Sequence, residues 1–445
     1  MRFNRRLRKQ VAILGGKRDP FTSFLSLINS EKVDFVGIGD SNQLLSGFGW
    51  DHGFQYALSQ SFAPYATGLI SANEAGGGGG GQGYLYKYSG GTDVGAFTGA
   101  PSDLAKYLAE GLGDNFADYG YLSDDDSFLN NFTGMDTDAA WPGVNSALTA
   151  RFHYGTFPAG TASVNFQVRY AETPYSTLGQ LSVDPVTGSY GMTHADIALT
   201  AATRDKKIAA YWQYSGQTMQ GPFFGTYVHL IDTAKSAGWS YTSLIANGGG
   251  SLYDLSYDLE EQGADSTTHW FQCLRDRQGA RKHFCIVINS GLNDRNETET
   301  SRGPLAIADG DSAAAYADNA DSIIRQINAL WATNGWDANE LTYLLMPSHP
   351  VSDPDDAELV SYRAAAKSLA AGYSNVSFVD ISELTDEAEM LAGGWYASGG
   401  TDRSHLTQAG YENLSVRVVA QDPVFLMEDG TQFLMEDGTE FWMEG

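Results

Sequence analysis

The stretch Val33-Asp34-Phe35-Val36-Gly37-Ile38-Gly39-Asp40-Ser41-Asn42 decides how this chain folds. Its first six residues form a short, β-rich and mostly apolar run, which is typical of a strand buried on both faces of a parallel sheet. The run stops at a glycine and a short polar turn. Ser41 therefore stands just beyond the carboxyl end of a buried strand, where open α/β sheets bind their ligands.

Four similar apolar runs occur much later and predict further strands, at residues 241–246, 283–288, 341–346 and 376–381. Helical patterns lie between them, the clearest at 313–331 and 357–369. Strands that alternate with helices predict an α/β fold with a doubly wound parallel sheet. We assign residues 33–59 and 240–421 to this α/β domain.

Roughly two hundred residues separate the first predicted strand from the second, far more than an ordinary crossover needs. We therefore expect an inserted unit. Residues 60–147 include the glycine run 76–81 and predict a glycine-rich linker and irregular insert. Within 148–239, apolar and polar residues alternate, for example over 164–170. This pattern predicts an inserted β-sandwich or jelly roll of the carbohydrate-binding kind.

Both ends of the chain are unusual in composition. Lys and Arg crowd the first eighteen residues and predict a basic arm over residues 1–32. The apolar run 11–14 is too short for a secretory signal, so we expect none. The tail, 422–445, repeats Met-Glu-Asp-Gly with a period of eight residues, as short strands and turns would. Three such units cannot bury their own apolar residues, so we expect the 425–444 repeats to dock on the body of the protein or on another chain. We also expect the chain to form a homo-oligomer or to join a larger particle, through these repeats or through the basic arm.

Composition excludes several classes of function. The formal net charge of −27 argues against nucleic-acid binding. No apolar stretch is long enough to span a membrane. Cys273 and Cys285 are expected to be free core thiols rather than a disulfide. The acidic run 124–126 lacks the spacing of a calcium loop, and no zinc motif occurs, so we expect no metal and no cofactor.

The chemistry-bearing residues follow predicted strands. Ser41 suits a nucleophile presented on a sharp turn, although a helix N-cap is the alternative. Asp402 precedes His405 by three positions, which suits an acid and base pair, or a capping aspartate and a surface histidine. Gly250 (or Gly249) and Asn293 follow two other predicted strands, where they would donate to an oxyanion or merely form turns.

Taken in order, Gly39-Asp40-Ser41-Asn42, the glycine turn 248–250, Gly291-Leu292-Asn293-Asp294 and Asp402-x-x-His405 resemble the four blocks of the SGNH (GDSL-like) hydrolase superfamily. The resemblance implies a flavodoxin-like Ser-His-Asp hydrolase without a metal. It makes Ser41 the nucleophile, His405 the base and Asp402 its orienting partner. The Ser41 N–H, a glycine N–H from Gly250 or Gly249, and the Asn293 side chain would form the oxyanion hole. The glycine block departs from the family's commoner form, whose turn is longer and less rich in glycine.

SGNH enzymes with an added β-domain often act on acylated polysaccharides, so we expect a serine esterase that removes acyl groups, chiefly O-acetyl, through an acyl-enzyme. Aromatic residues in the insert would either grip sugar or form the sandwich core: Tyr211, Trp212, Tyr214, Phe223, Phe224 and Tyr227. The arm, the glycine run and the repeats resemble phage-tail proteins, which favours a virion location over the cytoplasm and a host glycan as substrate. The alternatives are a non-catalytic glycan-binding or structural module of a particle, and a general lipase or arylesterase.

Overall fold

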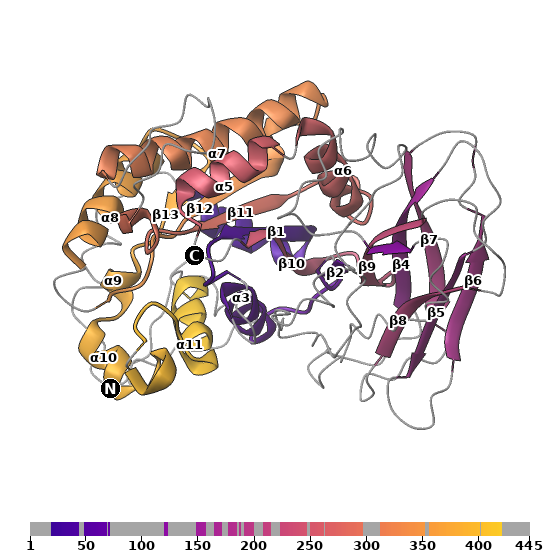
Figure 1. Ribbon diagram of the computed structural model, residues 1–445, viewed down its shortest axis with the longest axis horizontal. Coiled ribbons are helices and arrows are strands. Elements are labelled where there is room, and N and C mark those ends of the chain that lie inside the picture. The colour runs from indigo at the N-terminus through magenta and orange to yellow at the C-terminus, as the bar shows by residue number, and fades with distance from the viewer. Residues whose placement is uncertain are drawn as a thin grey trace, which may run out of the picture.

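The structure, a computed structural model, describes residues 19–43, 49–68, 70–71, 120–122, 148–156, 164–170, 177–184, 187, 191–199, 208–214, 223–246, 250–261, 263–296, 312–351, 356–400 and 402–420. These residues form two units that lie side by side (Figure 1). One unit is a parallel sheet flanked by helices, and the other consists of antiparallel strands. The polypeptide passes from the first unit into the second and back again.

A five-stranded parallel sheet, in the order β10-β1-β11-β12-β13, forms the centre of the first unit. Its strands are β1 (Lys32–Gly39), β10 (Gly238–Ala246), β11 (Phe284–Asn289), β12 (Leu341–Leu345) and β13 (Val376–Phe378). Counted along the chain, this is the 2-1-3-4-5 order of flavodoxin-like sheets, with its switch point between β1 and β11. The predicted α/β fold with a parallel sheet is confirmed.

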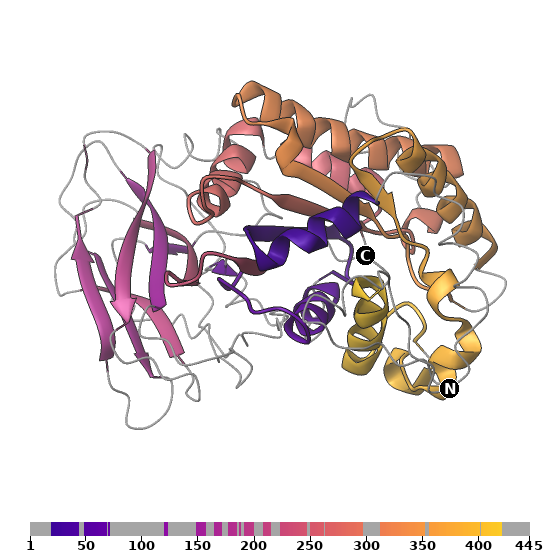
Figure 2. The same cartoon turned by 180° about the vertical axis from the view of Figure 1, so that it is seen from behind.

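Helices cover both faces of this sheet (Figures 1 and 2). On one face lie α5 (Leu252–Glu261), α6 (Gly263–Arg275), α7 (Ala313–Thr333) and α8 (Asp356–Ala371). On the other lie α2 (Pro20–Leu25), α3 (Trp50–Ser59), α10 (Glu387–Ala392) and α11 (Gln408–Val419). Within β1, Phe35 packs toward the second group and Val36 toward the first. Because both faces are covered, successive residues of the strand are apolar.

The N-terminal boundary differs from the expected one. The sequence pattern predicts a basic arm over residues 1–32, but within it α2 and the 3-10 helix η1 (Ser26–Asn29) pack on the sheet. The N-terminal cluster of basic residues ends at Arg18. The segment that follows buries four apolar side chains: Phe21, Phe24, Leu25 and Ile28. Asp19 caps α2 and also accepts a hydrogen bond from Ser377 of β13 at 2.7 Å. This segment therefore belongs to the α/β unit.

Two strand boundaries also differ. The run 376–381 forms a strand only to Phe378, because the Asp380 side chain caps the short helix α9 (Ile381–Leu384). Strand β10 already begins at Gly238, paired with Lys32, rather than at residue 241 as predicted. Apolar composition alone does not distinguish a strand from the start of a buried helix.

The second unit contains two antiparallel sheets. One has the order β2-β9-β4-β7, with β3 also paired to β9, and the other has the order β6-β5-β8. Phe152 of β4 stacks on Phe166 of β5 at 4.7 Å between ring centroids, so the sheets pack face to face. The strands are β2 (Ile70–Ser71), β3 (Gly120–Leu122), β4 (Leu148–Thr156), β5 (Val164–Tyr170), β6 (Thr177–Val183), β7 (Gly191–Leu199), β8 (Ile208–Tyr214) and β9 (Phe223–Asp232). Strands β2 and β3 come from the segment expected to be irregular. A jelly-roll topology and carbohydrate binding remain predictions.

A buried polar cluster lies where the two units meet. Arg277, after α6, forms an ion pair with Asp34 of β1, and both side chains are fully buried. Asp34 also accepts hydrogen bonds from Tyr65 at 2.7 Å and from Gln278 at 2.6 Å. Arg277 further contacts His229 of β9 at 2.9 Å. This cluster joins the first strand of the sheet to the inserted unit.

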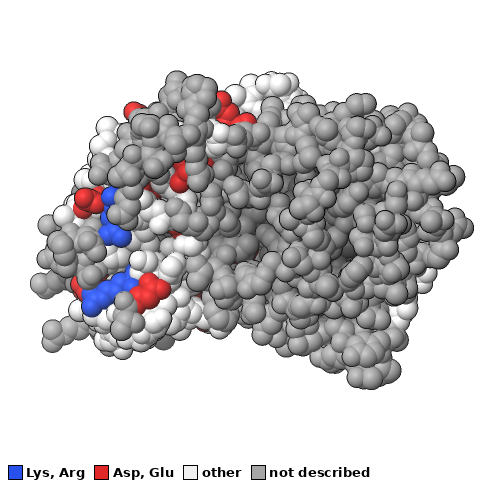
Figure 3. All heavy atoms as spheres, viewed as in Figure 1, with Lys and Arg blue, Asp and Glu red and all other residues white. Residues whose placement is uncertain are grey.

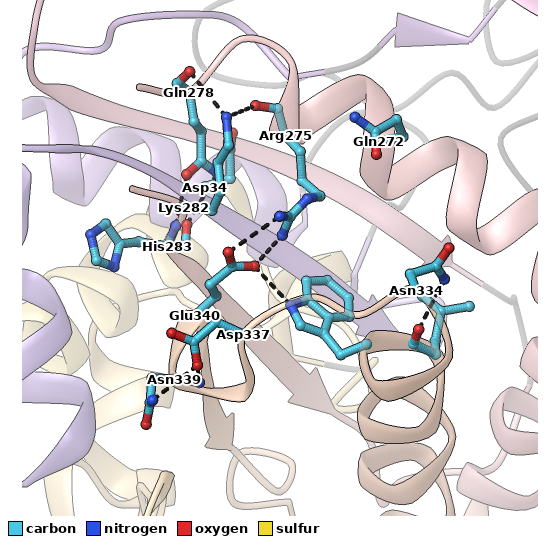
Figure 4. Close-up of polar contacts among 12 residues, drawn as sticks. Asp34, Gln272, Arg275, Gln278, Lys282, His283, Asn334, Asp337, Asn339 and Glu340 are labelled. Atoms are coloured by element: carbon cyan, nitrogen blue, oxygen red, sulfur yellow. Dashed lines mark hydrogen bonds and ion pairs between the residues drawn. The ribbon is translucent and has the colours of Figure 1, made fainter. Parts of the chain in front are cut away.

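Figure 4 shows the edge of the sheet on which this cluster lies, at the amino ends of the strands. There Arg275 points at Glu340, which also accepts a hydrogen bond from Trp331 at 3.0 Å. Lys282 reaches the carbonyl oxygens of Arg275 and Gln278. These contacts are structural, because Ser41 lies at the opposite edge of the sheet.

Other expectations concern the rest of the chain. Cys273 and Cys285 are buried thiols that do not form a disulfide, as predicted. Across the described ranges, none of the helices is both long enough and apolar enough to cross a bilayer. On the face shown in Figure 3, the basic side chains of described residues lie beside acidic ones, and further acidic side chains stand apart from any basic one. Among the ion pairs of the described residues, Arg417 pairs with Glu389 at 2.6 Å. Residues 1–18, 76–81, 124–126 and 425–444 lie outside the described residues, so the predictions made for them stay predictions.

Candidate active site

Ser41 lies on a tight turn at the carboxyl end of β1. The backbone N–H of Asn42 donates to Asp40 Oδ1 at 2.8 Å, and that of Gln43 donates to the Asp40 carbonyl at 2.9 Å. Gly39 is required because a Cβ there would lie 2.7 Å from the carbonyl oxygen of Asn289 on β11. The next described helix, α3, has Gly49 as its N-cap. Ser41 is therefore held by a turn that follows β1, not at the start of that helix.

His405 and Asp402 complete a hydrogen-bonded chain with Ser41. The Oγ of Ser41 lies 3.0 Å from His405 Nε2, and His405 Nδ1 lies 2.8 Å from Asp402 Oδ2. Partial burial would raise the pKa of Asp402, but hydrogen bonds from His405 and from the Ser404 N–H outweigh it, so this pKa lies below its usual value. A carboxylate therefore faces Nδ1, which leaves Nε2 free to accept a proton from Ser41.

The loop that carries the acid and the base is fixed at several points. Asp402 Oδ1 accepts hydrogen bonds from the backbone N–H groups of Ser404 at 3.0 Å and His405 at 3.3 Å. Thr407 then caps α11. Asp402 is thus both a capping residue for its own turn and the partner of His405, so the two interpretations of the sequence motif are compatible.

His349 holds the same loop from the side. It lies just beyond β12, and its Nε2 is 3.0 Å from the carbonyl oxygen of Arg403. Because a carbonyl only accepts, Nε2 carries the proton. Burial lowers the pKa of His349 to about 4, so the ring is neutral near neutral pH. This second histidine therefore positions the loop.

Asn293 and Gly250 lie next to each other. Asn293 Nδ2 donates to the Gly250 carbonyl at 3.1 Å, and its second N–H remains for another acceptor. Gly291 has φ of +136°, which favours glycine and lets the chain turn sharply between β11 and Asn293. Gly249, the alternative donor, lies outside the described residues. The expected oxyanion donors thus follow β1, β10 and β11.

Two buried carboxyl groups lie beneath these turns. Asp294 accepts hydrogen bonds from the Leu252 N–H at 3.0 Å and from Ser290 Oγ at 2.9 Å. Burial, with a smaller contribution from the neighbouring Asp40, raises the pKa of Asp294 to about 7 against these hydrogen bonds. Burial likewise raises the pKa of Asp40 to about 6, against the hydrogen bonds from Asn42. Asp294 ties the Asn293 turn to the start of α5, while Asp40 shapes the Ser41 turn.

Sequence reasoning missed three residues around the site. His349 follows a predicted strand directly, in Met346-Pro347-Ser348-His349-Pro350, so its position after a strand end was an available signal. Asn42 stands in the motif Gly39-Asp40-Ser41-Asn42, but the motif alone predicts no separate role for its side chain. Tyr411 lies on the apolar face of a predicted helix, and nothing in the pattern distinguishes a functional hydroxyl from a core tyrosine. Its partner in the structure is Asn42, described below.

No protein-family model and no curated protein matches this chain significantly. Similar solved structures include carbohydrate esterases. A family 2 carbohydrate esterase with a carbohydrate-binding domain from Corynascus thermopiles (Myceliophthora fergusii) is 15% identical, covering 62% of this chain and 93% of that one, with a TM-score of 0.29. A family two carbohydrate esterase from Cellvibrio japonicus is 12% identical, covering 61% and 87%, with a TM-score of 0.26. An acetyl xylan esterase from Butyrivibrio proteoclasticus is 9% identical, covering 62% and 86%, with a TM-score of 0.27. These scores are too low to place the chain in any of these families.

Proposed function

We propose that the protein is a serine ester hydrolase in which Ser41, His405 and Asp402 form the catalytic triad. The observation that carries this proposal is the continuous hydrogen-bonded chain from Ser41 Oγ through His405 to Asp402, with distances of 3.0 and 2.8 Å. Side chains of His405 and Asp402 are 28% and 37% exposed, so solvent reaches the triad. A nucleophile, base and orienting acid in hydrogen-bond contact are the recognised requirement for acyl transfer.

In this mechanism the Ser41 oxygen attacks the ester carbonyl carbon while His405 Nε2 takes the serine proton. The ester oxygen then leaves as an alcohol, protonated by His405, and the acyl group stays on Ser41. Water, deprotonated by the same histidine, releases the acid and restores the serine. Asn293, with the Ser41 and Gly250 N–H groups, would stabilise the negative oxygen that forms in both steps.

The substrate class is an acylated polysaccharide, with O-acetyl as the acyl group. Support comes from the inserted unit, whose two packed antiparallel sheets are an architecture common among sugar-binding domains. Strands β8 and β9 include Tyr211, Trp212, Tyr214 and Tyr227, residue types that stack on sugars. A role on a virus particle, acting on host surface glycan, remains part of the proposal and depends on the arm and the tail.

The test is acetate release from an O-acetylated polysaccharide by the wild type, Ser41→Ala and Ser361→Ala. Ser361 lies on the exposed side of α8, so its variant is a matched control. Wild type and control are expected to release acetate at equal rates, and Ser41→Ala at the background rate. Acetate release by Ser41→Ala at the wild-type rate would contradict a mechanism in which Ser41 is the nucleophile. Binding of the polysaccharide without release of any acid would favour the non-catalytic alternative.

A further inference from the structure

The residue after the nucleophile is held by hydrogen bonds on every side. Asn42 is 2% exposed, and its Oδ1 accepts a hydrogen bond from the Tyr411 hydroxyl at 2.6 Å. Its Nδ2 donates to Asp40 Oδ1 at 3.1 Å, and its backbone N–H donates to the same oxygen at 2.8 Å. Asn42 therefore joins Tyr411 to the carboxyl group that shapes the Ser41 turn.

The direction of each hydrogen bond follows from the chemistry of the groups. Burial raises the pKa of Tyr411 well above its usual value, so the hydroxyl stays protonated and donates its one proton. Asn42 must then present its oxygen to Tyr411 and its NH2 group to Asp40. In the flipped orientation the amide oxygen would face a carboxyl oxygen, which repels it unless Asp40 is protonated. Tyr411 thus selects the amide orientation that supports the Ser41 turn.

Tyr411 belongs to the helix that follows the catalytic base. Helix α11 begins directly after the 402–407 loop and is capped by Thr407. It packs closely on α3, because a Cβ at Gly53 would lie 2.6 Å from the Tyr411 carbonyl oxygen. The rings of Trp50 and Tyr411 meet edge to face at 5.5 Å, and the backbone N–H of Trp50 donates to the Asn42 carbonyl at 2.8 Å. Tyr411 therefore reaches Asn42 both directly and through Trp50.

We propose that Tyr411 and Asn42 are positioning residues, which couple the turn carrying Ser41 to the helix that follows His405 and so hold the nucleophile and the base at hydrogen-bond distance. This inference rests on the proposed function. Neither residue touches the reacting atoms. Their effect is on the geometry of Ser41 relative to His405, which governs the rate of acyl transfer more than substrate affinity.

The first test compares Tyr411→Phe with Tyr343→Phe. Tyr343 is an equally buried tyrosine on β12 whose hydroxyl also lies near an amide oxygen, Asn328 Oδ1, at 2.9 Å, but away from the site. For hydrolysis of an aryl acetate, Tyr411→Phe should lower kcat about 10-fold with KM unchanged, since an ångström of misplacement can cost roughly 100-fold. Tyr343→Phe should keep the wild-type kcat. A wild-type kcat in Tyr411→Phe would overturn the inference.

A double-mutant cycle tests the coupling itself. Asn42→Ala should lower kcat at least as much as Tyr411→Phe. The double variant should be no slower than Asn42→Ala alone, because both changes remove the same hydrogen-bonded link from Tyr411 through Asn42 to Asp40. Losses that multiply in the double variant would show that the two residues act independently and would overturn the coupling.

Two further readouts separate this inference from the proposed function. The rate at which a fluorophosphonate labels Ser41 needs no ester substrate, and it should fall about 10-fold in Tyr411→Phe, for the same loss of alignment. A protein that is labelled at Ser41 but cleaves no ester would lose the proposed function, while the labelling rates would still judge the inference.

If the wild type shows neither ester cleavage nor labelling at Ser41, hydrogen exchange of the Asn42 side-chain amide, followed by NMR, tests the inference instead. This exchange should be slow in the wild type and in Tyr343→Phe and fast in Tyr411→Phe. Equal exchange rates in all three proteins would overturn the inference.

Discussion

Ser41 Oγ and His405 Nε2 lie 3.0 Å apart although 364 positions separate the two residues in the chain. The sheet order brings them together, because β1 is central and α11 packs on α3, the next described helix after the Ser41 turn. The large insertion between β1 and β10 leaves this geometry intact, since β10 returns to pair with β1 along its whole length. A serine near one end of the chain and a histidine near the other thus form one site.

Replacing Asp402 with asparagine should impair catalysis through the histidine tautomer. An amide facing Nδ1 can donate, which moves the ring proton to Nε2 and prevents His405 from accepting the serine proton. The same change in a buried protease triad costs about 10⁴-fold in kcat. Asp402 is 37% exposed, so water can partly substitute, and we expect a smaller loss of about 10²- to 10³-fold. Steady-state kinetics with an aryl acetate measures it, and a change below 10-fold would contradict the assigned role.

Removing the Asn293 side chain should slow the chemical step without weakening substrate binding. Loss of one oxyanion donor typically costs about 10²- to 10³-fold in kcat. Asn375→Ala is the matched control, because Asn375 Nδ2 also donates to a backbone carbonyl, that of Leu341, at 3.1 Å. We expect kcat to fall only in Asn293→Ala, with KM nearly unchanged. Equal kcat values for the two variants would remove Asn293 from the oxyanion hole.

The raised pKa of Asp294, about 7, predicts a pH-dependent stability. The unfolded carboxyl ionises near pH 4, so between about pH 4 and pH 7 the folded state holds a proton that the unfolded state has lost. Stability is therefore complete below about pH 4 and declines as pH rises toward 7. Relative to Asp294→Asn, the wild type should lose up to about 1.4 kcal/mol of unfolding free energy per pH unit in this window. Urea unfolding of both proteins at several pH values measures this difference in unfolding free energy. A difference that stays constant between pH 4 and pH 7 would contradict the raised pKa of Asp294.

The Asp34–Arg277 ion pair should matter for stability and not for catalysis. Asp34→Ala leaves a buried guanidinium without its carboxylate, which typically costs about 3–5 kcal/mol. Glu31→Ala breaks an exposed pair with Arg281, at 3.6 Å, and should cost under about 1 kcal/mol. Thermal unfolding of both variants checks the difference. The kcat of folded Asp34→Ala should match the wild type, and a large loss of kcat would place Asp34 in the site.

The sequence predicts the strands of the α/β unit well because β1 and β11 are buried on both faces, which demands continuous apolar runs. It predicts the boundaries less well, since burial and not composition decides where an apolar segment changes from strand to helix. The assignment of residues 19–31 to the arm is wrong for this reason. The helix at Pro20–Leu25 contains only six residues, too few for a helical period to stand out.

The residues of the site also fall into those that the sequence predicts and those that it does not. Ser41, Asn293, Asp402 and His405 stand out because each follows a strand or precedes a helix within a short polar motif. His349 and Tyr411 act through contacts with Arg403 and Asn42, residues far from them in the chain. Such contacts depend on how helices pack around the sheet, and no local pattern encodes them.

The central claim is that Ser41 is a nucleophile activated by His405, and fluorophosphonate labelling followed by peptide mass spectrometry tests it most directly. The wild type should gain one phosphonyl group, on the peptide that contains Ser41. Ser41→Ala should gain none, and His405→Ala should react far more slowly. Label on a different residue, or ester hydrolysis by a wild type whose Ser41 stays unlabelled, would contradict the claim.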